Sequence, residues 1–107
     1  MTKIFAKQEV KYHDPVLFET QGRYSMDAAV EILTWLEEQP DCVIENAGWK
    51  SSGYGSLVEV AISVRLGDIE FTIMCSYEQI FIKRLSGNKM KFYDICEKIR
   101  DLDFDET

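Results

Sequence analysis

The chain lacks the residue sets that build common catalytic and metal sites. Its only histidine is His13, and its three cysteines, Cys42, Cys75 and Cys96, lie far apart and form no C-x-x-C pair. Any Cys–His or Ser–His nucleophile pair would have to use His13, which lies in a His-Asp-Pro turn with no motif around any cysteine or serine. We therefore expect no catalytic residue, no metal site, no cofactor and no enzymatic activity.

The odd number and wide spacing of the cysteines also argue against a disulfide framework. Reduced, mostly buried thiols in a cytoplasmic protein are the simplest interpretation. No apolar run approaches the ~20 residues of a transmembrane helix, and residues 1–12 contain no long apolar core of the kind found in signal peptides. We expect a cytoplasmic protein that does not contact a membrane.

Basic residues are missing from one long stretch of the chain. The sequence has 12 Lys and Arg against 19 Asp and Glu, a net charge of -7, which disfavours direct binding to nucleic acid. No Lys or Arg occurs between Arg23 and Lys50. The carboxylates in this stretch are Asp27, Glu31, Glu37, Glu38, Asp41 and Glu45. Such a concentration of negative charge favours a basic protein partner.

Residues 57–77 read as two alternating apolar runs joined at Gly67-Asp68, which predicts a β-hairpin. A two-residue turn, with Gly67 supplying a positive φ, places Arg65 opposite Glu70, a favourable cross-strand pair. The pairs predicted on the apolar face are Leu66/Ile69, Val64/Phe71, Ile62/Ile73 and Val60/Cys75. The hairpin should therefore form the centre of a sheet.

A further strand, residues 79–85, should pair beside the second arm of this hairpin. In that register Phe81 lies beside Met74 and Ala61 on the outer face of the sheet. An outer face that is partly apolar needs a cover. The cover could be a helix of the same chain, a second copy or a foreign partner.

A helix is predicted from Ser25, as N-cap, to about Gln39, before Pro40. Its predicted inward stripe is Met26, Ala29, Val30, Leu33 and Leu36, with Ile32 and Trp35 on the flank. The residues predicted on the opposite face are Asp27, Glu31, Thr34 and Glu38. The helix should therefore carry an acidic ridge.

A second amphipathic helix is predicted near the end of the chain and should end near Asp101. Its apolar positions are Phe92, Ile95, Cys96, Ile99 and Leu102. Residues 103–107 should form a flexible acidic tail. Residues 3–12 are predicted to form a half-buried strand and residues 42–47 another, while residues 16–24 fit either a strand or an irregular connection.

These elements predict one α+β domain over residues 1–107. It should contain a single antiparallel sheet of four to five strands and two helices, in the order β-α-β-β-β-β-α. Residues 48–56, between two predicted strands, should form a loop that carries two large aromatic residues, Trp49 and Tyr54.

Two surfaces are candidates for partner binding. The first is the acidic set Asp27, Glu31, Glu37, Glu38, Asp41 and Glu45, which could steer a basic protein or be an ordinary solvated surface. The second is the apolar set Trp49, Tyr54, Met74 and Phe81, which could supply desolvated anchors or pack into the core.

The leading hypothesis for function is a small acidic protein-binding module. Its most specific form is an inhibitor or immunity-type protein that blocks a basic surface of a toxin, nuclease or other nucleic-acid-handling protein by imitating the charge of DNA. One alternative is an acidic chaperone or adaptor, or a homodimer, that uses the outer sheet face. Another is a ligand-binding or catalytic domain with a pocket near Trp49 and Tyr54.

Overall fold

The computed structural model describes residues 15–20, 24–51 and 58–102. The elements are β1 (Val16–Glu19), α2 (Ser25–Glu37), β2 (Cys42–Ser51), β3 (Val58–Leu66), β4 (Ile69–Ser76), β5 (Gln79–Ser86) and α3 (Lys89–Arg100). This is the predicted α+β fold, with one antiparallel sheet of five strands, two helices and the order β-α-β-β-β-β-α. The predicted strand at residues 3–12 and the predicted tail at residues 103–107 lie outside the described residues.

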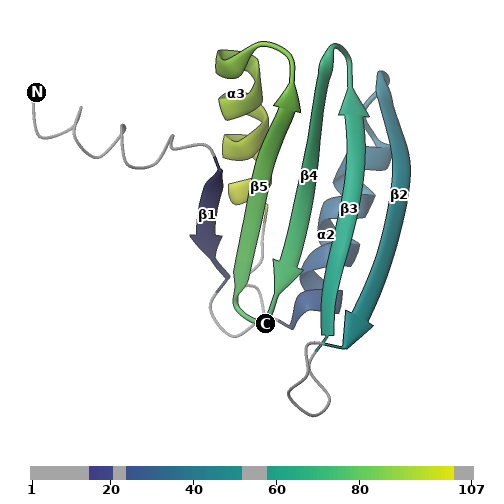
Figure 1. The fold of residues 1–107 in the computed structure, drawn as a ribbon, viewed down its shortest axis with the longest axis vertical. Helices are drawn as coiled ribbons and strands as arrows, with labels where there is room; N and C mark the ends of the chain where they lie inside the picture. The colour runs from purple at the N-terminus through teal and green to yellow at the C-terminus, as the bar shows by residue number, and fades with distance from the viewer. Residues whose placement is uncertain (1–14, 21–23, 52–57, 103–107) are drawn as a thin grey trace, which may run out of the picture.

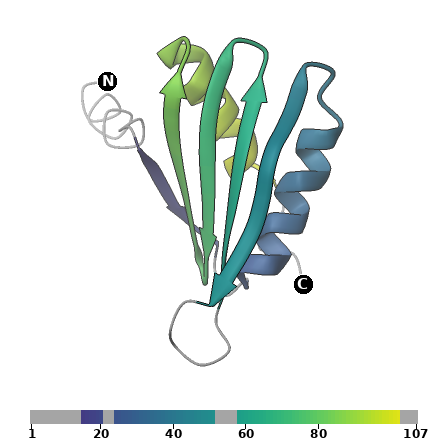
Figure 2. The same cartoon turned by 45° about the vertical axis from the view of Figure 1, so that its right-hand side comes forward.

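The strands lie side by side in the order β1-β5-β4-β3-β2, so β1 and β2 form the two edges of the sheet. Both helices pack on the same face, α3 behind β5 and α2 behind β3 and β2 (Figures 1 and 2). No described helix or strand covers the other face, which we call the open face. The short edge strand β1 lies in the segment for which the sequence left two interpretations.

The central hairpin has the predicted register, with Leu66 opposite Ile69 across the turn. Gly67 has a φ of 62°, and a positive φ at the first turn residue alone is the type II′ pattern that suits the twist of a hairpin. Phe81 lies opposite Met74, and Met74 opposite Ala61, as predicted. The alternation of apolar and polar residues therefore determined this part of the fold.

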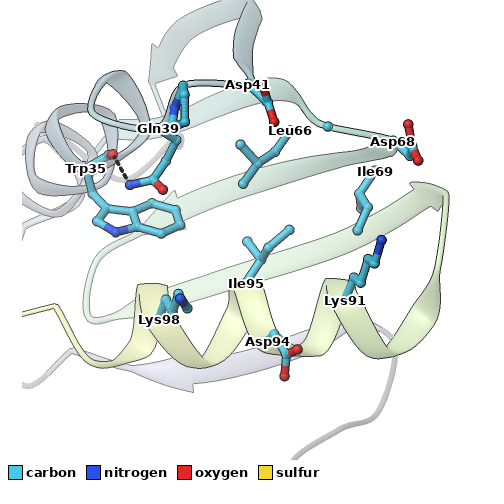
Figure 3. A pocket seen from close by; sticks show the side chains of 12 residues that line it. Trp35, Gln39, Asp41, Leu66, Asp68, Ile69, Lys91, Asp94, Ile95 and Lys98 are labelled. Carbon is cyan, nitrogen blue, oxygen red and sulfur yellow. Dashed lines mark hydrogen bonds between the residues drawn. The ribbon is translucent and has the colours of Figure 1, made fainter.

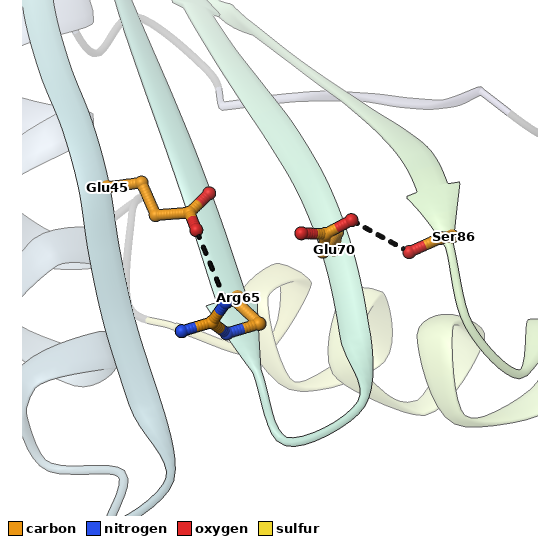
Figure 4. A network of polar contacts seen from close by, with 4 residues as sticks. All are labelled: Glu45, Arg65, Glu70 and Ser86. Carbon is orange, nitrogen blue, oxygen red and sulfur yellow. Dashed lines mark hydrogen bonds and ion pairs between the residues drawn. The ribbon is translucent and has the colours of Figure 1, made fainter.

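Arg65 lies opposite Glu70, as predicted, but its ion pair joins Nη1 to Oε2 of Glu45 on β2 at 3.6 Å. Glu70 instead accepts a hydrogen bond from the Ser86 hydroxyl on β5, at 2.9 Å (Figure 4). A bulge in β2 between Ile44 and Asn46 contains Glu45. These polar contacts run across the open face.

The core lies between the sheet and the two helices. Its strand residues are Val16, Val60, Ile62, Val64, Ile69, Phe71, Ile73, Cys75, Ile80 and Ile82. Its helix residues are Ala28, Ala29, Ile32, Leu36, Phe92, Tyr93, Ile95, Cys96 and Ile99. The rings of Phe71 and Phe92 meet edge to face with centroids 6.2 Å apart, so α3 packs directly on the central hairpin.

The predicted N-cap of α2 is wrong. Tyr24 is the N-cap, and Ser25 is the first helical residue and is buried. The Ser25 hydroxyl donates a hydrogen bond to the backbone carbonyl of Val58 at 2.6 Å. This bond connects the start of α2 to the start of β3, so the hydroxyl serves tertiary structure and not the helix end.

The predicted inward stripe of α2 is also partly wrong. The residues of α2 that are buried are Ser25, Ala28, Ala29, Ile32 and Leu36. Met26 and Val30, which were predicted to face inward, are 45% and 58% exposed. Ala28, Ala29, Ile32 and Leu36 face the core, so Met26 and Val30 lie on the flank of the helix.

The end of one strand differs from the prediction, and the end of the last helix agrees with it. The predicted strand at residues 42–47 continues to Ser51, so Trp49 lies in β2 and not in a loop. The last helix, α3, ends at Arg100 with Asp101 as its C-cap, as predicted. Its N-cap is Asn88, whose side chain accepts a hydrogen bond from the backbone N–H of Lys91 at 2.9 Å.

The three cysteines are free, and Cys75 and Cys96 are buried while Cys42 is half-buried. Burial raises the pKa of the Cys75 thiol to about 12. Among the described residues, neither helix has both the length and the apolar character needed to cross a membrane.

Candidate functional site

Three of the predicted site residues form the solvent face of α2 and its C-cap, Glu38. Asp27, Glu31 and Glu38 are exposed and follow helical spacing on the side away from the sheet. None of them has an ion-pair partner among the described residues. We call this set the acidic face. Carboxylates at such spacing repel one another, so the face carries an uncompensated negative potential.

The structure separates the other predicted acids from the acidic face. Asp41 lies in the turn between α2 and β2, where its carbonyl accepts a hydrogen bond from the N–H of Gly67 at 3.0 Å. Glu45 is paired with Arg65 on the open face. Glu37 lies on α2 but on the flank turned toward β2. The six acids therefore do not form one surface.

The position of Glu37 shows which flank of α2 faces β2. The pKa of the Cys42 thiol is raised by burial and, to a smaller extent, by the nearby Glu37 carboxylate. Cys42 is the first residue of β2, so the Glu37 side of α2 faces this strand. Met26 and Val30 lie on the same side as Glu37, at helical spacing (11 and 7 residues before it).

Trp49 lies on the same side of the molecule. It pairs with the buried Val60 across β2 and β3, and paired residues point to the same face of a sheet, which here is the helix-covered face. The bond from Ser25 to Val58 brings the start of α2 to this end of the sheet. Even so, the Trp49 side chain is 66% exposed, because β2 is an edge strand.

Figure 2 shows α2 running beside β2 at this edge of the sheet. Exposed apolar side chains of both elements therefore line this edge. They are Met26, Val30, Ala47 and Trp49, and we call them the apolar flank. The acidic face borders this flank on the same helix. Tyr54, the other aromatic residue predicted to take part, lies outside the described residues.

Met74 and Phe81 do not belong to this surface, because they point to the open face. Leu17 lies opposite Phe81, and Gly48 lies opposite Ala61. The register therefore forms one apolar row that crosses the whole sheet: Leu17, Phe81, Met74, Ala61 and Gly48. Leu17 is 56% and Phe81 40% exposed. The predicted apolar set is thus divided between two faces.

A groove of about 570 Å³ opens between α2 and α3, at the end of the sheet marked by the Gly67 turn (Figure 3). Trp35 forms one wall, and Leu66, Ile69 and Ile95 form an apolar floor. The other residues that line the groove are Gln39, Pro40, Asp41, Gly67, Asp68, Lys91, Asp94 and Lys98. Its volume is in the range of small-molecule sites.

The groove differs in place from the predicted pocket. It lies near the Cys42 end of β2, because Cys42 pairs with Leu66, whereas Trp49 lies toward the other end. Lys91 and Lys98, which sequence reasoning did not single out, are seven residues apart on α3 and share one side of it. That spacing is the only signal in the sequence that could have predicted that both lysines line one groove.

The described residues contain no group of three or more His, Cys, Asp or Glu side chains that could hold a metal ion. The arrangement offers surfaces for association: an acidic face, an exposed apolar flank and an open sheet face. Comparisons with protein-family models, curated proteins and solved structures gave no match to this chain.

Proposed function

We propose that this chain is a cytoplasmic protein-binding module, not an enzyme, and that it captures a basic protein through the acidic face and the apolar flank of α2. The observation that supports this most strongly is Trp49, which is 66% exposed on the edge strand β2, at the edge of the molecule that Met26 and Val30 of α2 also face. An exposed tryptophan bordered by unpaired carboxylates resembles the hot spots of protein interfaces, where a buried aromatic anchor is surrounded by polar contacts.

The two parts of this surface would act at different stages of binding. Asp27, Glu31 and Glu38 would attract a basic partner over distances of several ångströms and raise the association rate. Trp49 and the flexible Met26 would then be desolvated against the partner and slow its dissociation. Changes in the acidic face should therefore alter the association rate, and changes in the apolar flank should alter the dissociation rate.

The partner class follows from the charge. Proteins that bind nucleic acid present Lys and Arg to phosphate groups, and the carboxylates of the acidic face could occupy such a site in place of phosphates. An inhibitor or immunity-type protein directed against a nuclease, toxin or other nucleic-acid-handling protein fits this chemistry. Occlusion of the basic site would be the mechanism.

The experiment is affinity capture from the source cell with matched variants, followed by mass spectrometry. The variants are Trp49→Ala and the double change Glu31→Lys/Glu38→Lys. The control is Asp94→Lys/Asp101→Lys, which makes the same change in net charge on exposed positions of α3 and its C-cap. All variants change exposed side chains, so circular dichroism should show an unchanged fold.

We expect wild type and the α3 control to retain one basic protein that both test variants lose. With the purified partner, the charge reversal should lower the association rate, whereas Trp49→Ala should raise the dissociation rate. Raising the salt concentration should weaken capture, since exposed charges are screened beyond ~8 Å at physiological ionic strength. A partner that binds both test variants as well as wild type would contradict the proposal.

A further inference from the structure

We propose that the open face of the sheet binds a second copy of this chain, face to face, about a two-fold axis that runs parallel to the strands, in the plane between the two sheets and above the central strand β4. This surface lies on the side of the sheet opposite the helices, so the inference does not depend on the proposed function of α2 (Figure 1). Two neighbouring rows of side chains on the open face have an order that suits this symmetry.

The apolar row is tapered. Large side chains occupy one end, with Leu17 on β1 and Phe81 on β5, and small residues occupy the other, with Ala61 on β3 and Gly48 on β2. A Cβ atom added to Gly48 would meet nothing within 4 Å, so space is open above it. The proposed axis places Leu17 over Gly48 of the second copy and Phe81 over Ala61, with Met74 at the centre. A large side chain of one copy therefore lies over a small residue of the other at both ends of the row.

The neighbouring polar row has the same reciprocal order. It runs Glu19, Gln79, Ser76, Glu59 and Lys50, from β1 to β2. The same axis places the Glu19 carboxylate over the Lys50 ammonium of the second copy, and the Gln79 amide, a hydrogen-bond donor, over the Glu59 carboxylate. One symmetry operation therefore satisfies both rows, which is the self-complementarity that a two-fold interface requires.

The other in-plane axis, along the apolar row itself, fits poorly. It would place Leu17 over Leu17 and Phe81 over Phe81, which would hold the sheets apart at that end. Gly48 would then face Gly48 and leave a void at the other end. Both overlap and voids destabilise packed layers.

The size of the face suits a dimer. Five strands about 4.8 Å apart, with eight residues of about 3.4 Å each in the central strand, span on the order of 24 Å by 27 Å. Because β1 has only four residues, the face covers about 600 Å², which is at the lower end of the ~600–1,000 Å² that each partner buries in a standard interface. The dimer would have four layers, with α2 and α3 of each copy on the outside, so the acidic face and the apolar flank would stay accessible.

The first test measures the oligomeric state of the full chain by sedimentation equilibrium from about 1 μM to about 1 mM. We expect wild type to dimerise and Phe81→Asp to raise the dissociation constant at least about tenfold. Met90→Asp is the matched control, because Met90 is 63% exposed on α3, away from the open face, and should dimerise like wild type. If Phe81→Asp does not fold, Ala61→Arg, at an exposed position, makes the same test.

The second test is a charge exchange. Glu19 and Lys50 lie on the two opposite edge strands, so they cannot pair within one copy. Glu19→Lys and Lys50→Glu should each weaken the dimer, and the double variant should restore it. Restoration would identify the pairing between copies, whereas a double variant as weak as the single ones would overturn the proposed axis.

Salt dependence distinguishes this dimer from capture of a basic partner. Salt screens both the repulsion between two chains of net charge -7 and the attraction of the Glu19–Lys50 pairs. Raising salt from ~0.05 M to ~0.5 M should therefore weaken the dimer less than it weakens a complex through the acidic face, where only attraction is screened. A chain that stays monomeric over the whole concentration range, or a dimer that Phe81→Asp leaves intact, would overturn the proposal. A foreign protein that needs Phe81 while the chain alone stays monomeric would replace the second copy as occupant.

Discussion

Gly87 packs directly against Ile69, so closely that a Cβ atom added to Gly87 would lie 2.8 Å from the Ile69 Cα atom and 2.7 Å from the Asp68 carbonyl oxygen. Gly87 also has a φ of 106°, a conformation that L-residues with a side chain rarely adopt. The connection between β5 and α3 is therefore fitted against the turn of the central hairpin.

Replacing Gly87 by alanine should destabilise the fold by about 2–4 kcal/mol, because backbone strain and steric overlap add. The measurement is the free energy of unfolding from urea titration. Gly67→Ala is the control, since Gly67 also has a positive φ, 62°, but an added Cβ would meet nothing within 4 Å. It should cost only about 1–2 kcal/mol. Equal losses at the two positions would mean that Gly87 does not pack as described.

The Ser25 hydroxyl is a buried donor to the Val58 carbonyl, and this role can be distinguished from that of an N-cap. Aspartate is as good an N-cap as serine, but at this site it would bury a carboxylate beside a carbonyl oxygen with no donor between them. Ser25→Asp should therefore cost about 2–3 kcal/mol and Ser25→Ala about 1–2 kcal/mol in urea unfolding. Thr34→Ala, which removes an exposed hydroxyl that donates to the Val30 carbonyl, should be near neutral. An aspartate variant as stable as wild type would support the N-cap role instead.

The sheet could be predicted because its signal is local. Alternation with period two determines which residues of β3, β4 and β5 face the core, and the Gly67-Asp68 turn then determines the register. The position of α2 could not be predicted in the same way. Its apolar arc, from Met26 to Leu36, is wider than the strip that the sheet can cover, and the hydrogen bond from Ser25 to Val58 selects the part that is buried. That bond joins residues 33 positions apart.

The same limit applies to the candidate site. The sequence identified the acidic face correctly as exposed, because charge and helical spacing are read directly from the chain. The prediction placed Trp49 and Phe81 in one apolar surface, although β2 and β5 direct the two side chains to opposite faces of the sheet. The loop predicted for residues 48–56 caused this error, since a residue in a loop has no defined face, whereas β2 continues to Ser51.

Glu78 has a φ of 64°, and its carbonyl accepts a hydrogen bond from the N–H of Thr20 at 3.0 Å. A left-handed conformation costs a residue with a side chain about 1–2 kcal/mol, and glycine removes this cost. About half of the gain in stability is lost again, because glycine increases the conformational entropy of the unfolded chain. Glu78→Gly should therefore stabilise the fold by about 0.5–1 kcal/mol in urea unfolding.

Glu78→Gly should also change the titration of Tyr77. The Glu78 carboxylate is the main cause that raises the pKa of the Tyr77 phenol above its ordinary value of 10.0, so the variant should lower that pKa. Ultraviolet absorbance measures it. Glu78→Gln is the matched control, because it removes the charge and keeps the backbone strain. It should lower the pKa without the gain in stability, and a gain equal to that of glycine would exclude strain as the cause.

Cys75 should make the protein sensitive to alkaline pH. Burial raises the pKa of its thiol from 9.0 to about 12, so the folded state disfavours the thiolate and the unfolded state does not. The stability is fully present below pH 9.0 and is lost as the pH rises toward 12, by at most about 1.4 kcal/mol per pH unit from this group. Cys75→Ala should reduce the slope of unfolding free energy against pH above pH 9.0, whatever its effect at neutral pH. An unchanged slope would show that Cys75 is not buried as described.

The electrostatic effect of Glu37 on Cys42 indicates the orientation of α2, and the reactivity of the thiol tests it. Burial raises the pKa of Cys42 most, and the Glu37 carboxylate raises it further. Glu37→Gln should therefore lower the pKa, increase the thiolate fraction and speed alkylation of Cys42 by iodoacetamide at mildly alkaline pH, while the buried Cys75 and Cys96 stay protected. Glu38→Gln removes a charge from the next residue, which points away from β2, and should change the rate less. If both variants speed alkylation equally, only the net charge matters, and the flank that bears Met26 and Val30 does not face β2.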